Sequence, residues 1–255
     1  MLGLGVGFYK LGGEQGGSPW SPKKETSLEA WWRYGVGITT RTSGEVEYVT
    51  AWADQSGNGH DMLQTDPGEQ PVYQTGGDIL FDPTSDTQNL ALVDGAGAGY
   101  DPASITLGGE FVVGIRMNPS GASTVIMGSN HVSKANEMVK LNSGSVMRLK
   151  NDGSGGHHDF TLDSGNTTDD SYWVISRDES DNITVYKDGS SSPFVANGLS
   201  RDGTFVIDAI GVRNNNPAGG AGTNNFDGTI KEIVIFKGTT SAALIANVNN
   251  RLSTL

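Results

Sequence analysis

Short runs of alternating apolar and polar residues recur along most of the chain, separated by turn signals. Alternation of this kind, rich in β-branched and aromatic residues, predicts strands that bury one face. The separators contain Asn-Gly, Asp-Gly, Ser-Gly and Gly-Gly pairs, which supply the positive φ of tight turns. The pattern predicts an all-β fold, an antiparallel sandwich or barrel, with strands at 46–52, 78–81, 89–93, 110–117, 123–127, 137–141, 145–149, 172–177, 182–187, 204–210 and 229–236.

A short helix is predicted near the N-terminus. Thr26 and Glu29 have the spacing of a capping box, and Trp31 and Trp32 follow directly. Two adjacent residues cannot share one helix face, so one of these tryptophans is expected at a rim and the other against the core. Stacking on sugar rings is the alternative role, and core packing is favoured.

A second helix is predicted at the C-terminus. Either Thr240 or Ser241 has a side chain suited to an N-cap. The apolar residues that follow recur at helical spacing and share one face. We expect this face to pack against the sandwich through Leu244, Ile245, Val248 and Leu252.

Residues 1–24 differ from the rest and are interpreted as an extended docking arm. Apolar side chains alternate with Gly3, Gly5 and Gly7, which suits a strand with one apolar face. A flexible leader is the other interpretation. We expect the arm to add to a partner or to a neighbouring copy, and its docking residues are Leu2, Leu4, Val6, Phe8, Tyr9 and Leu11.

Charge argues against one class of partner, and the length of the apolar runs argues against another. The sequence carries 17 Lys and Arg against 29 Asp and Glu, a formal net charge of −12. A nucleic-acid-binding protein needs a basic surface to displace counterions, so no nucleic-acid partner is expected. No run approaches about 18 consecutive apolar residues, so no membrane span is expected either.

Some kinds of chemistry are excluded by residue type. There are no cysteines, so disulfides, zinc–thiolate sites and cysteine nucleophiles are absent. The stretch MLGLGVGFYK places its first cation after the apolar residues and is interrupted by glycines, which is unlike a secretory signal peptide. We therefore expect the protein to be made in a cytoplasm without a signal peptide.

Three blocks of sequence resemble the concanavalin A-like, or laminin-G-like, jelly-roll domains. The first is the Trp-x-Asp-x-Ser-Gly-Asn-Gly turn at 52–59, followed by Pro-x-Tyr at 71–73 and a strand ending in Phe81-Asp82. The second is a pair of strands, the later of which ends in the hairpin Tyr-Lys-Asp-Gly at 186–189. The third, residues 226–236, is similar to the closing strand F-x-G-x-I-x-E-x-x-x-F/Y of the family.

This resemblance implies a two-sheet antiparallel jelly-roll sandwich over residues 25–255, behind the arm at 1–24. The family includes lectins, glycan hydrolases, adhesion modules and viral structural proteins, so the fold alone does not name a function. The opening Met-Leu-Gly-Leu-Gly also resembles bacteriophage structural proteins.

Catalysis is not expected. A retaining glucanase of this fold needs two carboxylates about 5–5.5 Å apart, carried on a Glu-x-Asp-x-x-Glu strand. The nearest alternation, Glu45-Val46-Glu47, lacks the third acid. A G-x-S-x-G elbow and a phosphate-cradling G-x-x-x-x-G-K motif are also missing. We therefore predict a protein that is not an enzyme and has no catalytic residues.

Asp54, Asn58 and Asp61 offer oxygen ligands within one short turn, which suits calcium. The spacing and the terminal glutamate of an EF-hand are missing, and Asp and Asn beside glycines more often cap turns. Turn capping is therefore the favoured interpretation, with calcium as the alternative and no other cofactor expected. His157 and His158 are adjacent, so on a strand they would face opposite sides and not share a metal.

Candidates for glycan contact come from aromatic and amide side chains. Trp20 and Tyr100 have aromatic faces on which a pyranose ring could stack, and amides can donate and accept hydrogen bonds to hydroxyls. The amide candidates flank a Pro-Ala-Gly-Gly loop and are Asn214, Asn215 and Asn224.

These observations lead to a hypothesis and one alternative. The hypothesis is a non-enzymatic virion structural protein of the capsid decoration type, located on the virion surface. Its arm would bind a capsid or other virion protein, or sister subunits, and its acidic lectin-like sandwich would face solvent and host glycans. The alternative is a carbohydrate-binding module or adhesin, in a tail fibre or on a cell surface.

Overall fold

A computed structural model of the chain describes residues 19–82, 88–92, 104–128, 137–151, 157–161, 168–190, 194–195, 203–212 and 225–255. The docking residues expected between positions 2 and 11 lie outside these ranges. Within them the chain is mostly antiparallel β-structure with one C-terminal α-helix, which confirms the fold class expected from the sequence.

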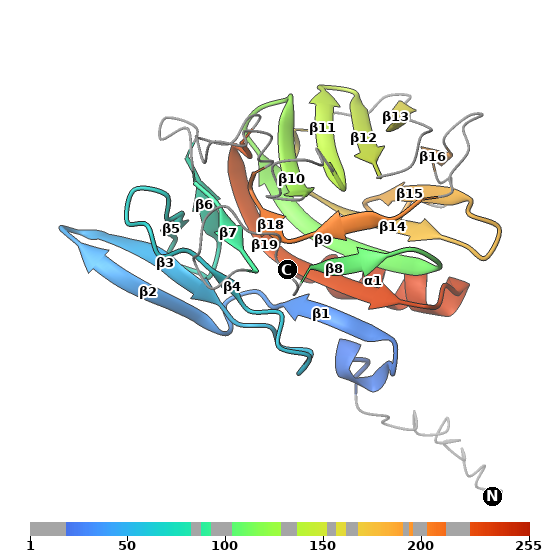
Figure 1. Cartoon of the computed structure of the whole chain (residues 1–255), viewed down its shortest axis with the longest axis horizontal. Helices are drawn as coiled ribbons and strands as arrows, with labels where there is room; N and C mark the ends of the chain where they lie inside the picture. Colours follow the sequence, from blue (N-terminus) through green and yellow to red (C-terminus); the bar gives the residue numbers. More distant parts are fainter. Residues whose placement is uncertain are drawn as a thin grey trace, which may run out of the picture.

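One layer is built around the long strand β19 (Figure 1). Its first residues pair with β6 and its last with β1, while the whole strand pairs with β9 on the other side. Beyond β9 follow β14, β15 and β16. The strands of this layer are β1 (Leu28–Trp32), β6 (Ile79–Phe81), β9 (Phe111–Pro119), β14 (Ser171–Arg177), β15 (Ile183–Lys187), β16 (Phe194–Val195) and β19 (Gly228–Lys237).

The second layer runs from the protruding hairpin of β2 and β3 to β13, through β4, β7, β18, β10, β11 and β12. Strand β5 joins β3 to β6, and β8 pairs with β17 in a separate ribbon. Their bounds are β2 (Ile38–Ser43), β3 (Val46–Trp52), β4 (Met62–Leu63), β5 (Val72–Tyr73), β7 (Leu90–Ala91), β8 (Ile105–Leu107), β10 (Thr124–Gly128), β11 (Val139–Ser143), β12 (Val146–Lys150), β13 (His157–Thr161), β17 (Phe205–Ile207) and β18 (Ala209–Ile210).

The main core lies between the two layers and follows the period of 2 along each strand. On β9 the side chains of Phe111, Val113, Ile115 and Met117 enter this core, and on β12 those of Met147 and Leu149 do. The intervening residues of β9 point to the opposite face, as alternation requires. The apolar side chains that the sequence pattern predicts to be buried therefore lie between the two layers.

Residues 28–32 form strand β1, which corrects the helix expected there; the short N-terminal helix is a 3-10 turn at Pro22–Lys24 instead. Strand β1 pairs with the end of β19, including Trp31 with Val234. Neighbouring residues on a strand face opposite sides, so Trp32 is buried in the main core and Trp31 on the outer face. Neither tryptophan lies at a rim, because the pairing gives each a buried side.

The C-terminal helix α1 (Ala242–Leu252) covers the outer face of the first layer and confirms the sequence prediction (Figure 1). Its N-cap is Ser241, whose Oγ accepts a hydrogen bond from the backbone N–H of Leu244 at 3.1 Å. Leu244, Val248 and Leu252 pack with apolar residues of β1, β9, β14 and β19. A Cβ on Gly114 of β9 would lie 2.5 Å from Cγ1 of Val248, so the helix sits as close as glycine permits.

A buried ion pair fastens this helix to the sheet. Glu232 on β19 is fully buried and accepts hydrogen bonds from Arg251 on α1, at 2.9 Å to Oε1 and 2.8 Å to Oε2. Trp31 donates its indole N–H to the same carboxylate at 2.9 Å. The Arg251 guanidinium also lies over the Trp31 ring, 5.8 Å from its centroid. Because the carboxylate is paired and hydrogen-bonded, its burial is tolerated.

The sequence prediction misses several of the strands that the structure describes. Strand β2 is missed because its sequence Ile-Thr-Thr-Arg-Thr-Ser has no apolar alternation. Strand β13, with His157 exposed and His158 buried, is missed for the same reason, although the opposite facing of the two histidines is as expected. The segment 204–210 is split at Asp208 into β17 and β18, which pair with different strands.

Candidate functional site

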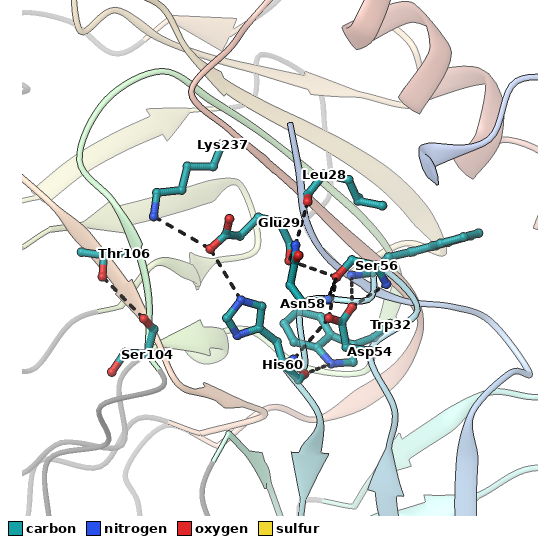
Figure 2. Close-up of polar contacts among 11 residues, drawn as sticks. Leu28, Glu29, Trp32, Asp54, Ser56, Asn58, His60, Ser104, Thr106 and Lys237 are labelled. Carbon is teal, nitrogen blue, oxygen red and sulfur yellow. Dashed lines mark hydrogen bonds and ion pairs between the residues drawn. The ribbon is translucent and has the colours of Figure 1, made fainter. Parts of the chain in front are cut away.

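The loop between β3 and β4 folds around the carboxylate of Asp54 (Figure 2). Its Oδ1 accepts hydrogen bonds from the backbone N–H groups of Trp31 at 2.9 Å and Ser56 at 2.8 Å. Its Oδ2 accepts from the Ser56 hydroxyl at 2.5 Å and from the His60 N–H at 3.2 Å. Burial opposes ionisation of Asp54, yet these hydrogen bonds, led by the one from the Ser56 side chain, lower its pKa below the ordinary value of 3.8.

The other two oxygen-bearing candidates for calcium in this loop also make protein contacts. Asn58 donates its side-chain amide to the carbonyls of Leu28 at 2.9 Å and Glu29 at 2.8 Å, and Asp61 accepts from the N–H of Asp54 at 2.8 Å. The loop is thereby tied to β1. In the ranges that the structure describes, no three His, Asp or Glu side chains come together as metal ligands would.

Glu29 links this loop to the end of β19 (Figure 2). Its Oε1 lies 3.5 Å from Nε2 of His60 and 3.8 Å from Nζ of Lys237. The indole N–H of Trp32 donates to the His60 carbonyl at 2.8 Å. The polar groups of this region therefore contact one another and join β1, β19 and the loop, as expected for residues that stabilise the fold.

Two aspartates meet where β6 and β19 pair. Asp82 follows β6 directly and Asp227 precedes β19, and Phe81 is the register partner of Gly228. Burial raises the pKa of Asp227; a hydrogen bond from Ser120 acts in the opposite direction, and the charge of Asp82 raises the pKa further. A carboxyl group perturbed by a like charge is a recognised feature of acid–base sites.

The outer face of β11, β12 and β13 carries a second and larger polar cluster, which we call the charged face. Val139 and Leu141 point into the main core, so Lys140 between them points outward. Register places Lys140 beside Arg148, Arg148 beside Asp159, and Lys150 beside His157. Directly paired residues have Cβ atoms about 4.5–5.5 Å apart, so the charged face consists of two adjoining rows of ionisable side chains.

Arg148 and Asp159 form the fixed centre of the charged face. The guanidinium donates to both carboxylate oxygens, from Nε at 2.7 Å and from the second nitrogen at 2.9 Å. The hydrogen bond from Arg148 is the main reason that the pKa of Asp159 is lowered, and the same bond raises the pKa of Arg148. Such bidentate pairing holds both side chains in one orientation.

Lys140 and Lys150 add positive charge on either side of this pair. Lys140 is 8% exposed, and Nζ lies 3.6 Å from the buried carboxylate of Glu137. Burial first, then the charges of Arg148 and Lys150, lower the pKa of Lys140. Lys150 has no carboxylate partner among the described residues. The charges of Arg148 and Lys150 therefore act against the positive charge of Lys140.

Of the residues expected to contact glycans, the structure describes Trp20, which does not lie on the charged face. Trp20 packs against Phe236, with ring centroids 6.3 Å apart, and donates its indole N–H to Glu25 at 2.7 Å. The other candidates, Tyr100, Asn214, Asn215 and Asn224, lie outside the described residues.

Sequence reasoning passed over the members of the charged face other than His157. One signal for them was present, because Arg148 and Lys150 alternate with Met147 and Leu149 and so had to share the polar side of a predicted strand. The partners across the sheet carried no such signal. Only pairing of β12 with β11 and β13 brings Lys140, Asp159 and His157 beside them.

No protein-family model and no curated protein matches the sequence. Solved structures do resemble it. An arabinofuranosidase complexed with arabinofuranosyl-α-1,2-xylobiose superposes with a TM-score of 0.50 at 14% identity, covering 92% of this chain and 60% of that one. The chain thus spans about 60% of the length of that protein. This likeness supports the β-sandwich fold.

Two further structures give lower scores. Domain 4 of an extracellular GH43 arabinanase from Geobacillus stearothermophilus, in complex with arabinotriose, has a TM-score of 0.48 at 12% identity, covering 88% of this chain and 98% of that one. The binding domain of botulinum neurotoxin DC, in complex with rat synaptotagmin II, has a TM-score of 0.46 at 15% identity, covering 91% and 52%.

Proposed function

We propose that this chain is a non-enzymatic glycan-binding module and that the charged face is its binding surface. The observation that carries the proposal is the bidentate pair of Arg148 and Asp159 at the centre of that face, flanked by further hydrogen-bonding side chains in register. Saccharide hydroxyls need donors and acceptors held in fixed positions, because preorganised groups lose little entropy on binding. The sugar-bound arabinofuranosidase of similar fold adds support.

The experiment is a glycan array probed with the full chain and with two variants. Arg148→Ala removes the centre of the charged face, and Lys23→Ala removes a cation on the 3-10 turn at Pro22–Lys24, at the far end of the molecule in Figure 1. We expect the wild type and Lys23→Ala to bind the same saccharides and Arg148→Ala to lose them. An array without any bound saccharide would overturn the proposal.

The proposal of a non-enzymatic module has its own test at Asp82 and Asp227. We expect no release of reducing sugar from any saccharide that the array identifies. If hydrolysis were found and Asp227→Asn abolished it, the raised pKa of Asp227 would mark a general acid instead, and the module would be an enzyme.

The virion decoration hypothesis stays a prediction from the sequence, as does location on a virion surface. It has a direct test: deletion of residues 1–24 should abolish association with particles while the sandwich stays folded. Unchanged association would contradict it. Glycan binding and a place on a virion are compatible, so either result leaves the first proposal open to its own test.

A further inference from the structure

We propose that the charged face binds an acidic saccharide through its sugar carboxylate, with Lys150 and Arg148 as the groups that recognise it. This inference rests on the proposed function and names the class of ligand for the same surface.

Among the described residues, the charge on this face has the opposite sign to the charge of the chain. Three cations, Lys140, Arg148 and Lys150, stand there against two acids, Glu137 and Asp159, which sum to 3 − 2 = +1 when His157 is left out of the count. The chain as a whole carries −12. A local positive surface on an acidic protein attracts an anion while the remaining surface repels it, which favours docking of an acidic ligand at this face.

The donors on this face are not exhausted by contacts within the protein. Arg148 uses Nε and one terminal nitrogen on Asp159, which leaves the other terminal nitrogen for a ligand. Lys150, two residues along the same strand and on the same side, has three N–H donors and no carboxylate partner among the described residues. A single carboxylate group placed between these side chains would accept hydrogen bonds from both.

The same side chains are open to solvent. Arg148 and Lys150 are half-buried, and His157, Asp159 and Thr161 of β13 are exposed. Lys140, by contrast, is 8% exposed, so it adds to the positive potential of the face without being open to a ligand. Asp159 and Thr161 remain as acceptors and donors for neutral hydroxyls, so the face offers one anion subsite beside hydroxyl-binding groups.

The test compares two matched saccharides on the full chain by calorimetry. Tri-galacturonic acid carries three carboxylates, and galactotriose is its neutral counterpart. We expect tri-galacturonic acid to bind at least about tenfold more tightly, and its affinity to fall as sodium chloride is raised. Methyl-esterified tri-galacturonate, which lacks the charge and keeps the ring, should behave like galactotriose.

Variants then locate the subsite. Lys150→Gln should weaken tri-galacturonic acid binding about tenfold, as expected for loss of one charge-assisted hydrogen bond, and Lys23→Gln should leave it unchanged. Circular dichroism melts of both variants confirm that the fold is kept.

Three outcomes would overturn the inference in distinguishable ways. Equal binding of the acidic and neutral trisaccharides would refute the acidic class and leave glycan binding intact. Tight binding of tri-galacturonic acid that Lys150→Gln does not weaken would refute the location. Absence of binding by either trisaccharide, together with an array that shows no bound saccharide, would refute the proposed function itself.

Discussion

The two outer faces of the sandwich are built from the same alternating strands and are used in opposite ways. The face formed by β1, β9, β14 and β19 is apolar and is covered by α1, with the Glu232–Arg251 pair beneath the helix. The face formed by β11, β12 and β13 is charged and keeps exposed side chains. In one case the residues facing away from the core stabilise the fold, and in the other they remain available for a ligand.

The difference shows that charge alone does not identify a binding surface. Glu232 and Arg251 form an ion pair, and each is satisfied by the other and by Trp31. Lys150 has no such partner among the described residues. What distinguishes the two regions is whether the hydrogen-bonding capacity of a charged group is used within the protein.

The largest expected effect comes from breaking the covered face at its ion pair. Glu232→Ala removes the fully buried carboxylate and leaves the half-buried Arg251 guanidinium without its partner. Removing one member of a buried pair costs about 3–5 kcal/mol. Urea unfolding should therefore show a strongly lowered midpoint, while Glu47→Ala, at an exposed carboxylate of β3, should leave it nearly unchanged. Equal loss in both variants would contradict the importance of the pair.

A smaller effect is expected from the loop that holds β1 beside this face. Asp54→Ala removes four hydrogen bonds to a carboxylate, and bonds to charged groups contribute about 1.5–3 kcal/mol. Because Asp54 is only half-buried, the lower part of that range applies, and thermal unfolding would measure it. Addition of calcium should not restore the variant or stabilise the wild type; a clear calcium-dependent rise in melting temperature would favour the metal interpretation instead.

Asp54 also makes the free energy of unfolding depend on pH. The pKa of Asp54 is lowered on folding from its ordinary value of 3.8. Its contribution is therefore fully present above the unfolded value and is lost as pH falls through the lower folded value. Unfolding measured at pH 5 and at pH 3 should show a smaller difference for Asp54→Ala than for the wild type. The opposite order would mean that the carboxylate is not stabilised in its ionised form.

Gly114 tests how closely the covered face and its helix fit. A Cβ at this position would lie 2.5 Å from Cγ1 of Val248 and 3.0 Å from Cδ1 of Leu252. Overpacking of this kind costs about 1–3 kcal/mol, so Gly114→Ala should lower the urea midpoint. Shortening the helix side chain in the double variant Gly114→Ala, Val248→Ala should cost less than the sum of the single changes. Simple additivity would contradict the close approach.

The smallest effect on stability is expected on the charged face. Arg148 and Asp159 form a partly exposed pair, and such pairs contribute about 0.2–1 kcal/mol. Arg148→Ala should therefore shift the unfolding midpoint by less than Glu232→Ala, Asp54→Ala or Gly114→Ala while removing saccharide binding. A large loss of stability in this variant would mean that the charged face supports the fold, as the covered face does.

The sequence predicts much of the fold and little of the site. Strands such as β12 and β15 were within reach because alternation of apolar residues survives in any pairing. The segment at 28–32 was not, because the Thr26 to Glu29 capping pattern is local, and pairing with β19 overrode it. Within the described part of the chain, no helix is long and apolar enough to cross a membrane.

The sequence by itself therefore determined the local elements. These are strands with one face in the core, turns with glycines, and a C-terminal helix capped by Ser241. These follow from interactions within a few residues. The tertiary structure decided which outward-facing residues are neighbours. It places Lys140 on one side of Arg148 and Asp159 on the other, and it pairs Arg251 of the helix with Glu232 of the sheet. Those neighbours belong to different strands or helices, so strand register and helix docking bring them together, and no local pattern records either.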